Sequence, residues 1–228
     1  MEQIGFIGSL DKKDLLVNLG TILVNFGKRV LIIDATYMQR LRYMIPRVDS
    51  NNPMTFVGEY QGIDIAVGFM NYAGIAQYLG TNGLNYDFIF VDSDNIQTTY
   101  SFMLPSMKKL FFATSFDQFE IQRAVEMFAG LNRPMQFTKL IFSSYINNNE
   151  EKLLDHALGS QFVSFNQNKV IISDVDIDRV ATLENQVAKR VTFKHYSGVY
   201  KDGLEYLAAM ISEGIITQQD IKKMIKRI

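Results

Sequence analysis

The chain has 228 residues, of which 47% are hydrophobic and 21% are charged, and its formal net charge is −1. This composition is typical of one globular domain with a substantial core, and the near-neutral charge gives no global support for nucleic-acid binding. The absence of cysteine excludes disulfides, thiolate catalysis and zinc–thiolate sites.

Seven short apolar runs predict the strands of a buried, mainly parallel sheet. They are residues 4–7, 30–34, 63–67, 88–92, 109–114, 138–143 and 162–165. Helical patterns fall between most of them, at residues 15–26, 72–79, 116–131 and 150–158. Alternation of this kind indicates right-handed βαβ crossovers and a three-layer α/β/α architecture. Residues 54–57 are expected to pair with 63–67 as a hairpin or edge addition.

The end of the chain differs in character and is predicted to be a helical extension. Residues 204–212 read as a helix followed by Gly214 at a C-cap, and Thr217 with Asp220 resembles a capping box that starts another helix. We therefore divide the chain into a domain at 1–203 and an extension at 204–228.

The last eight residues predict a basic amphipathic helix. Its apolar stripe consists of Ile221, Met224, Ile225 and Ile228, and its cations are Lys222, Lys223, Lys226 and Arg227. Two interpretations stay open. The helix lies on an anionic membrane surface, or it packs on its own domain or on a partner.

The most informative stretch is the turn between the first strand and the first helix. It contains Gly8, Asp11, Lys12, Lys13 and Asp14. A strand, a tight turn, a helix and a second strand that ends in an acid form the opening of a nucleotide-binding α/β unit. In such a unit the turn is expected to be glycine-rich, so that backbone N–H groups can surround phosphate. Here the turn carries one glycine and two aspartates.

Two motifs carry a resemblance to a known family. Residues 18–20 (NLG) lead to residues 27–35 (GKRVLIIDA), and residues 86–93 (YDFIFVDS) form a second apolar strand that ends in Asp-Ser. This pattern resembles the deviant-Walker P-loop ATPases of the ParA/MinD family. The resemblance implies a P-loop NTPase-like fold and a homodimer. It also implies that Asp34 and Asp92 lie near the metal and the attacking water.

The departures from the family pattern concern the nucleotide site. The loop lacks the family's further glycines, and Asp14 lies near the position of the magnesium-binding Thr or Ser. Asp94-Asn95 replace the usual Pro and Gly, and Ser143-Ser144 stand where the family often has an adenine-facing Asn.

Gly8, Lys12 and Lys13 remain the candidate nucleotide-binding residues, although Asp11 and Asp14 would repel phosphate. For Asp34 and Asp92 the alternative role is to cap the helix or loop that follows. Hydrolysis, metal and cofactor are therefore not expected, and ATP with Mg²⁺ would bind only if the altered loop still holds phosphate.

These observations predict a pseudo-ATPase that acts as a positioning or assembly scaffold by dimerisation and partner binding. The systems implied by the resemblance are pilus, secretion or conjugation machinery, division and partition. Pilus assembly is preferred, because deviant relatives in that role resemble this chain in losing the phosphate loop. The alternative is a nucleotide-switch ATPase bound peripherally to membrane by its last helix. The start of the sequence lacks signal-peptide features, so a cytoplasmic location is expected, with peripheral membrane contact at the inner face in the alternative.

Overall fold

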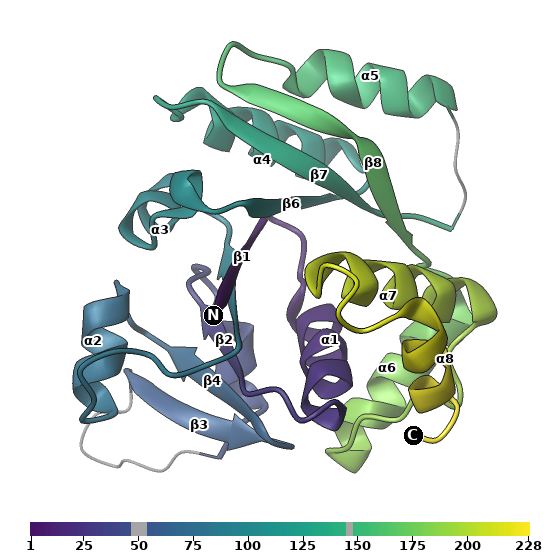
Figure 1. Ribbon diagram of the computed structural model, residues 1–228. Coiled ribbons are helices and arrows are strands. Elements are labelled where there is room, and N and C mark those ends of the chain that lie inside the picture. Colours follow the sequence, from purple (N-terminus) through teal and green to yellow (C-terminus); the bar gives the residue numbers. More distant parts are fainter. Residues whose placement is uncertain (47–53, 145–147) are drawn as a thin grey trace. The chain divides into compact units, whose positions relative to one another are not determined.

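The computed structural model describes residues 1–46, 54–144 and 148–228 (Figure 1). They form two compact units, Met1–Leu110 and Phe111–Ile228, which are described separately below.

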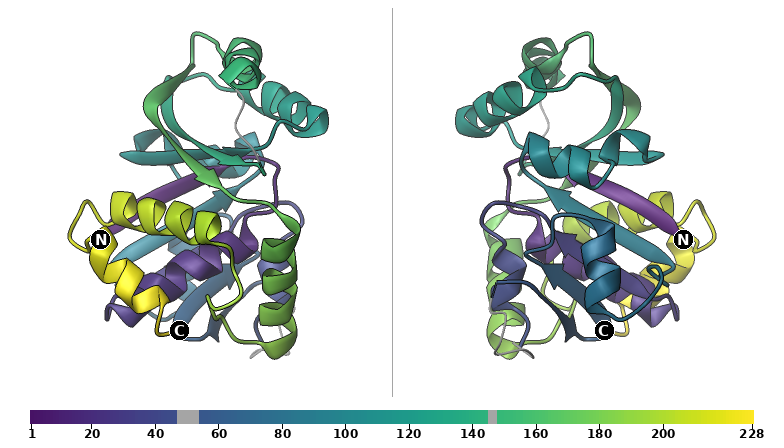
Figure 2. Two further views of the ribbon diagram at one scale, coloured as in Figure 1. Left: turned by 90° about the vertical axis from the view of Figure 1, so that its right-hand side faces the viewer. Right: turned by 90° about the vertical axis from the view of Figure 1, so that its left-hand side faces the viewer.

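The first unit is a mainly parallel sheet with helices on both faces. Its strands follow the order β3-β4-β2-β5-β1, and only β3 runs antiparallel to its neighbour. The strands are β1 (Glu2–Ile7), β2 (Val30–Asp34), β3 (Phe56–Tyr60), β4 (Ile63–Val67) and β5 (Phe88–Ser93). The helices are α1 (Lys13–Asn25), α2 (Tyr72–Tyr78) and α3 (Ile96–Ser101), with short 3-10 turns η1 (Arg40–Tyr43) and η2 (Leu104–Ser106). Helix α1 lies on one face of this sheet and α2 on the other (Figures 1 and 2).

Helix α1 packs closely on the sheet at Gly20. A Cβ at this position would lie 2.8 Å from Cδ1 of Ile63 on β4, so the Ile63 side chain would have to shift to accommodate it. Every residue of β2 is buried, as expected for a central parallel strand. The predicted β3–β4 hairpin is confirmed, but its first strand, β3, ends at Tyr60 and not at residue 57. The turn consists only of Gln61 and Gly62, both with positive φ, as a two-residue hairpin loop requires.

The second unit contains a parallel sheet in the order β6-β7-β8. Its strands are β6 (Lys109–Thr114, which starts just before the unit boundary), β7 (Met135–Phe142) and β8 (Val163–Ile172). Its helices are α4 (Gln118–Ala129), α5 (Asn148–Leu158), α6 (Asp176–Ala188), α7 (Gly198–Ile211) and α8 (Gln218–Ile225). Part of its core is a cluster of rings from Phe112, Phe128, Phe137 and Phe165, whose neighbouring centroids lie 5.0–6.4 Å apart.

Both capping signals predicted near the C-terminal helices are present in the structure. Gly214 has a φ of +73° just after α7, and Thr217 caps α8 by accepting a hydrogen bond from Asp220 N at 3.2 Å. Helix α7 begins at Gly198, so the predicted boundary between residues 203 and 204 falls inside this helix. Gly203 lies against β8, where a Cβ would be 2.3 Å from the carbonyl oxygen of Ile171. The sequence patterns had not predicted α3 or α6, and they had predicted only the first part of β8.

Candidate functional site

The residues singled out in the sequence meet at the carboxyl ends of β1, β2 and β5. Gly8 follows β1 with a φ of +140°, and its N–H donates to the carbonyl of Ser93 at 3.1 Å. Asp34 is the last residue of β2 and Asp92 the last but one of β5, and the two are paired in the register of these strands. Parallel strands thus bring the loop at 8–12 and both aspartates to one edge of the sheet.

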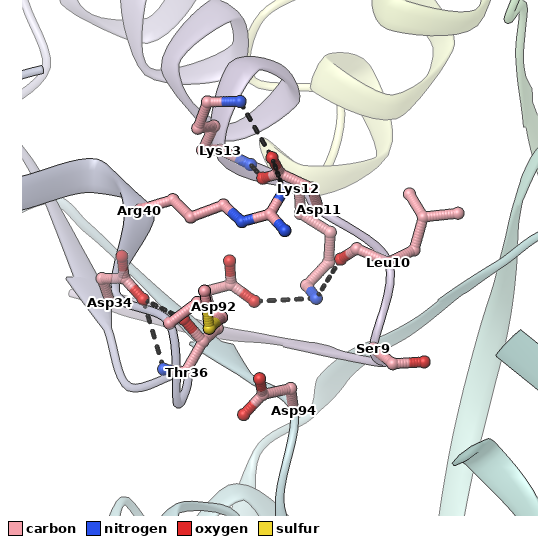
Figure 3. A pocket seen from close by; sticks show the side chains of 11 residues that line it. Ser9, Leu10, Asp11, Lys12, Lys13, Asp34, Thr36, Arg40, Asp92 and Asp94 are labelled. Carbon is pink, nitrogen blue, oxygen red and sulfur yellow. Dashed lines mark hydrogen bonds and ion pairs between the residues drawn. The ribbon is translucent and has the colours of Figure 1, made fainter. Parts of the chain in front are cut away.

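The central side chain of this site is Lys12, which is 1% exposed. Its Nζ donates to the carbonyl oxygens of Gly8 at 2.5 Å and Leu10 at 2.8 Å, and it forms an ion pair with Asp92 Oδ1 at 3.0 Å (Figure 3). An ammonium group has three N–H donors and is stable in a protein interior only when it is hydrogen-bonded and paired. Lys12 therefore finds its partners within its own loop and the adjacent strand.

Asp92 is the counter-ion of Lys12. Burial raises the pKa of Asp92 to about 7, with Lys12 opposing this rise and the negative charge of Asp34 adding to it. Its Oδ1 has the ion pair but no hydrogen bond of good geometry from the described residues. Contrary to the alternative interpretation, the Asp92 side chain does not cap the following helix. Asn95 does so, with Oδ1 accepting from Thr98 N at 2.9 Å, because it directly precedes α3.

Asp34 has the capping role that the alternative interpretation gave it. Its Oδ1 accepts from Thr36 N at 3.2 Å and Thr36 Oγ1 at 2.6 Å, and its Oδ2 accepts from Leu41 N at 3.0 Å. Burial raises the pKa of Asp34, while these hydrogen bonds and Lys12 oppose the rise. Both carboxylate oxygens are thus used to fix the loop between β2 and η1.

The start of α1 carries its own anion. Asp11 Oδ1 accepts from Lys13 N at 3.1 Å, so a carboxylate occupies the helix N-terminus where a phosphate would bind in a nucleotide site. Its Oδ2 pairs with Lys13 Nζ at 2.9 Å and Arg40 Nη1 at 2.7 Å, and Lys13 also pairs with Asp14 at 2.9 Å. Burial disfavours the Asp11 carboxylate, but the Lys13 and Arg40 cations outweigh this effect and lower its pKa.

The hollow between these side chains is small and acidic. Its volume is about 40 Å³, whereas sites for ligands of nucleotide size have about 300–1,000 Å³. The charged groups that line it are four carboxylates and three cations: Asp11, Asp34, Asp92, Asp94, Lys12, Lys13 and Arg40 (Figure 3). The described residues contain no group of three or more His, Cys, Asp or Glu arranged to hold a metal ion.

The sequence patterns did not identify the segment that closes this hollow. Thr36 binds Asp34, Arg40 binds Asp11, and Tyr37 N donates to Asp94 Oδ1 at 3.0 Å. An Asp followed two residues later by Thr is a typical side-chain turn signal and could have identified the first of these contacts. The other two are long-range and have no local signature.

The remaining sequence candidates lie in the second unit. Ser143 and Ser144, at the end of β7, line a separate hollow of about 300 Å³ together with Val175 and Val199. On α8, Ile221 is 0% exposed and Ile225 is 3% exposed, and this helix packs against α7. Two of the four residues of the predicted stripe, Ile221 and Ile225, thus lie inside the protein, and Met224 and Ile228 are half-buried.

The outer face of α8 is basic. Its residues Lys223, Lys226 and Arg227 are exposed, and Lys222 Nζ lies 3.9 Å from Asp202 Oδ1 on α7. No helix in the described part of the chain is long and apolar enough to cross a membrane.

Solved structures reveal the class of fold. The chain is similar to a ParA family ATPase from Chlorobium tepidum, with a TM-score of 0.57 and 13% identity over 90% of this chain and 97% of that chain. It is also similar to the cell division protein MinD from Aquifex aeolicus, with a TM-score of 0.54 and 14% identity over 95% of this chain and 100% of that chain. The chain therefore has the mainly parallel α/β/α fold of the ParA and MinD P-loop ATPases.

The similarity extends to an assembled protein. The structure of the MinC:MinD complex from Aquifex aeolicus matches with a TM-score of 0.51 and 16% identity, over 100% of this chain and 95% of that chain. No protein-family model matches the chain, and no curated protein matches its sequence. These identities establish the fold alone, so function has to be argued from the site.

Proposed function

We propose that the protein is a catalytically degenerate ParA/MinD-like protein that acts as a positioning or assembly scaffold through dimerisation and partner binding. The observation that carries this proposal is the Lys12 ammonium, which is bound to Gly8, Leu10 and Asp92 of its own chain. In a nucleotide-hydrolysing loop this group would have to be free to reach phosphate.

Phosphate binding would have to undo several favourable interactions at once. Lys12 would leave two carbonyl oxygens and a buried carboxylate, and Asp92 would then face a phosphate without its counter-ion. The amide at the start of α1 and the cations of Lys13 and Arg40 are already bound to Asp11. The site is thus neutralised by the chain itself, which favours a structural role over hydrolysis.

A partner surface is available at the same edge of the first unit. Tyr37, Met38 and Tyr43 are 64%, 65% and 79% exposed. The first two lie in the segment that closes the hollow, and Tyr43 ends η1, which follows it. Tyrosine and methionine are enriched in protein interfaces because they supply large contact areas, and methionine also adapts to partners of different shape. We assign this surface to a protein partner. The MinD structure in complex with MinC provides a precedent for such an interaction on this fold.

The systems that we propose are pilus, secretion or conjugation machinery, division and partition. Pilus assembly is the first choice, because the altered turn at residues 8–14 resembles that of deviant relatives in that role. Nucleic acid is not part of the proposal, since the net charge of the chain is −1.

A weak contact with an anionic membrane surface at the inner face is part of the proposal. It would be electrostatic, through Lys223, Lys226 and Arg227, at about 1 kcal/mol for each cation near the surface. Charge reversal at Lys223 and Lys226 should abolish low-salt cosedimentation with phosphatidylglycerol vesicles. Absence of cosedimentation by the unaltered chain would remove this part of the proposal.

The experiment for the scaffold role measures phosphate release and molecular mass by light scattering, with and without ATP and Mg²⁺. We expect release no faster than in Lys12→Ala/Lys13→Ala and the same mass in both conditions. Association that requires ATP, or hydrolysis that the double variant loses, would establish a nucleotide switch instead.

A further inference from the structure

Helix α6 has the reverse of the usual amphipathic arrangement. Its exposed side carries Ile177, Val180, Leu183 and Val187, which are 56%, 53%, 59% and 85% exposed. Surface helices normally turn such a stripe toward their own core.

The buried side of α6 is polar and has a defined structural role. Asp178 Oδ1 accepts from Ser197 N at 2.7 Å and Asp178 Oδ2 accepts from Ser197 Oγ at 2.9 Å. Asn185 donates to Thr192 O at 3.0 Å and accepts from Thr192 N at 3.2 Å. These bonds fix the segment between α6 and α7. The helix is therefore held in place by its polar side, and its aliphatic side faces solvent.

The four aliphatic residues recur at helical spacing and form one continuous ridge. A ridge of this kind fits between the side chains of a second helix, as in ordinary helix–helix packing. Glu184 lies on the same face, four residues after Val180, and pairs with His195 at 2.5 Å. The other positions of the ridge are aliphatic, which favours an apolar, helical occupant.

The charges at the two ends of α6 identify that occupant. Asp174 and Asp176 lie at its N-terminal end together with Arg179, which pairs with both, so two carboxylates face one cation there. Lys189, Arg190 and Lys194 follow its C-terminal end. The Asp176 side chain is 99% exposed. A second copy of α6 in the antiparallel direction places acidic residues against basic ones at both ends, whereas a parallel copy places like charges together.

We infer that α6 is a contact between two copies of this chain, paired antiparallel about a twofold axis near Thr182. Ile177 then packs against Val187 of the second copy, and Asp176 faces Arg190 of the second copy.

The contact is modest in area. A helix of 13 residues is about 20 Å long, and such a pair buries less than the roughly 800 Å² per partner of a standard interface. We therefore expect association in the micromolar range. This surface deepens the proposed function, since it supplies the dimerisation on which the scaffold rests.

The experiment uses engineered cysteines, for which the chain is well suited because it has none of its own. Ile177→Cys and Val187→Cys chains are prepared separately and as a mixture, and oxidised under mild conditions. Disulfides need Cα atoms about 4.4–6.8 Å apart. Antiparallel pairing therefore predicts a cross-linked dimer in the mixture. Each chain alone should cross-link poorly, because identical positions lie about 15 Å apart along the helices.

Sedimentation velocity then separates this surface from dimerisation in general. Val180→Glu should abolish self-association, and the control Leu153→Glu, at a 69% exposed position on α5, should leave it unchanged. Asp176→Arg and Arg190→Asp should each weaken association, and the double swap should restore it.

The outcomes distinguish the two proposals. A chain that is monomeric at all concentrations would refute both this inference and the dimeric scaffold. Self-association that persists in Val180→Glu would refute only the α6 contact. Vesicle binding that Val180→Glu abolishes in a monomeric chain would make this face a membrane contact and overturn the inference.

Discussion

Replacement of Lys12 by Met tests the arrangement of the site most sharply. Lys12 is 1% exposed and is the only partner of Asp92 Oδ1 among the described residues, at 3.0 Å. Methionine preserves most of the side-chain volume but removes the charge and the donors to Gly8 and Leu10. Removal of one partner of a buried ion pair typically costs about 3–5 kcal/mol of unfolding free energy.

The loss should depend on pH, because Asp92 titrates near neutrality. The pKa of Asp92 is raised to about 7 in the folded protein, against about 3.9 in the unfolded chain. In the unaltered protein its contribution to stability is thus fully present below about pH 4 and is lost as the pH rises through about 7, roughly 4 kcal/mol in all. Without Lys12 the pKa of Asp92 rises further, so Lys12→Met keeps losing stability above pH 7.

We expect Lys12→Met to lower the unfolding free energy by about 3–5 kcal/mol at pH 8. At pH 5 the loss should be about 1–3 kcal/mol, because Asp92 is then mostly protonated and only hydrogen bonds are lost. Urea unfolding followed by far-ultraviolet circular dichroism measures both values, since the chain lacks tryptophan. Lys13→Met is the matched control and should lose about 1 kcal/mol or less, because its ion pairs are partly exposed. Lys12→Met/Asp92→Asn should recover much of the loss at pH 8. A loss that is equal at both pH values would refute the reasoning.

Three further predictions concern the second unit. Lys139→Met should lower the unfolding free energy, measured in urea, by about 3 kcal/mol. This side chain is 4% exposed and pairs with Glu151 at 2.5 Å and with Asp155 at 2.9 Å. A loss below about 1 kcal/mol would contradict this prediction. Gly203→Ala should lower the melting temperature by several degrees through its clash with the β8 backbone, whereas Gly198→Ala, which meets nothing within 4 Å, should not. Ile221→Ala should lose about 2–4 kcal/mol if α8 packs on its own unit, and the 74% exposed Ile215 should tolerate Ala within about 0.5 kcal/mol; equal effects would argue against that packing.

The framework of the site follows from the sequence. Apolar runs that end in Asp34 and Asp92 predict parallel strands, and the topology of such strands brings their carboxyl ends to one edge. The capping role of Asp34 was among the predicted alternatives, and Thr36 supplies its partner locally. These features depend on periodicity and short-range chemistry, which a single sequence displays.

The roles of the charged side chains do not follow from the sequence. Lys12 and Lys13 are adjacent and equivalent as sequence candidates, yet Lys12 points inward to Asp92 and Lys13 pairs at the surface with Asp11 and Asp14. Which one is buried depends on the direction of the last residues before α1 and on carbonyl oxygens that carry no sequence signal. Long-range contacts of this kind, such as Arg40 with Asp11, are set by tertiary structure.

Helix α6 was missed for a related reason. Its aliphatic stripe has helical spacing, but that stripe is exposed. The buried side of the helix carries polar residues such as Asp178 and Asn185, which do not form the apolar face that predicts a core helix. On α8 the stripe was recognised, but sequence alone left membrane contact and packing equally open. Burial of Ile221 and Ile225 is a tertiary property that distinguishes the two helices.

Titration calorimetry with ATP and Mg²⁺ tests the central claim, that Lys12 closes the phosphate site from within. We predict no binding heat beyond dilution, which corresponds to a dissociation constant weaker than about 1 mM. A dissociation constant below about 10 µM that Lys12→Ala/Lys13→Ala abolishes would contradict the claim, because Lys12 would then have to exchange Asp92 and its loop carbonyls for phosphate.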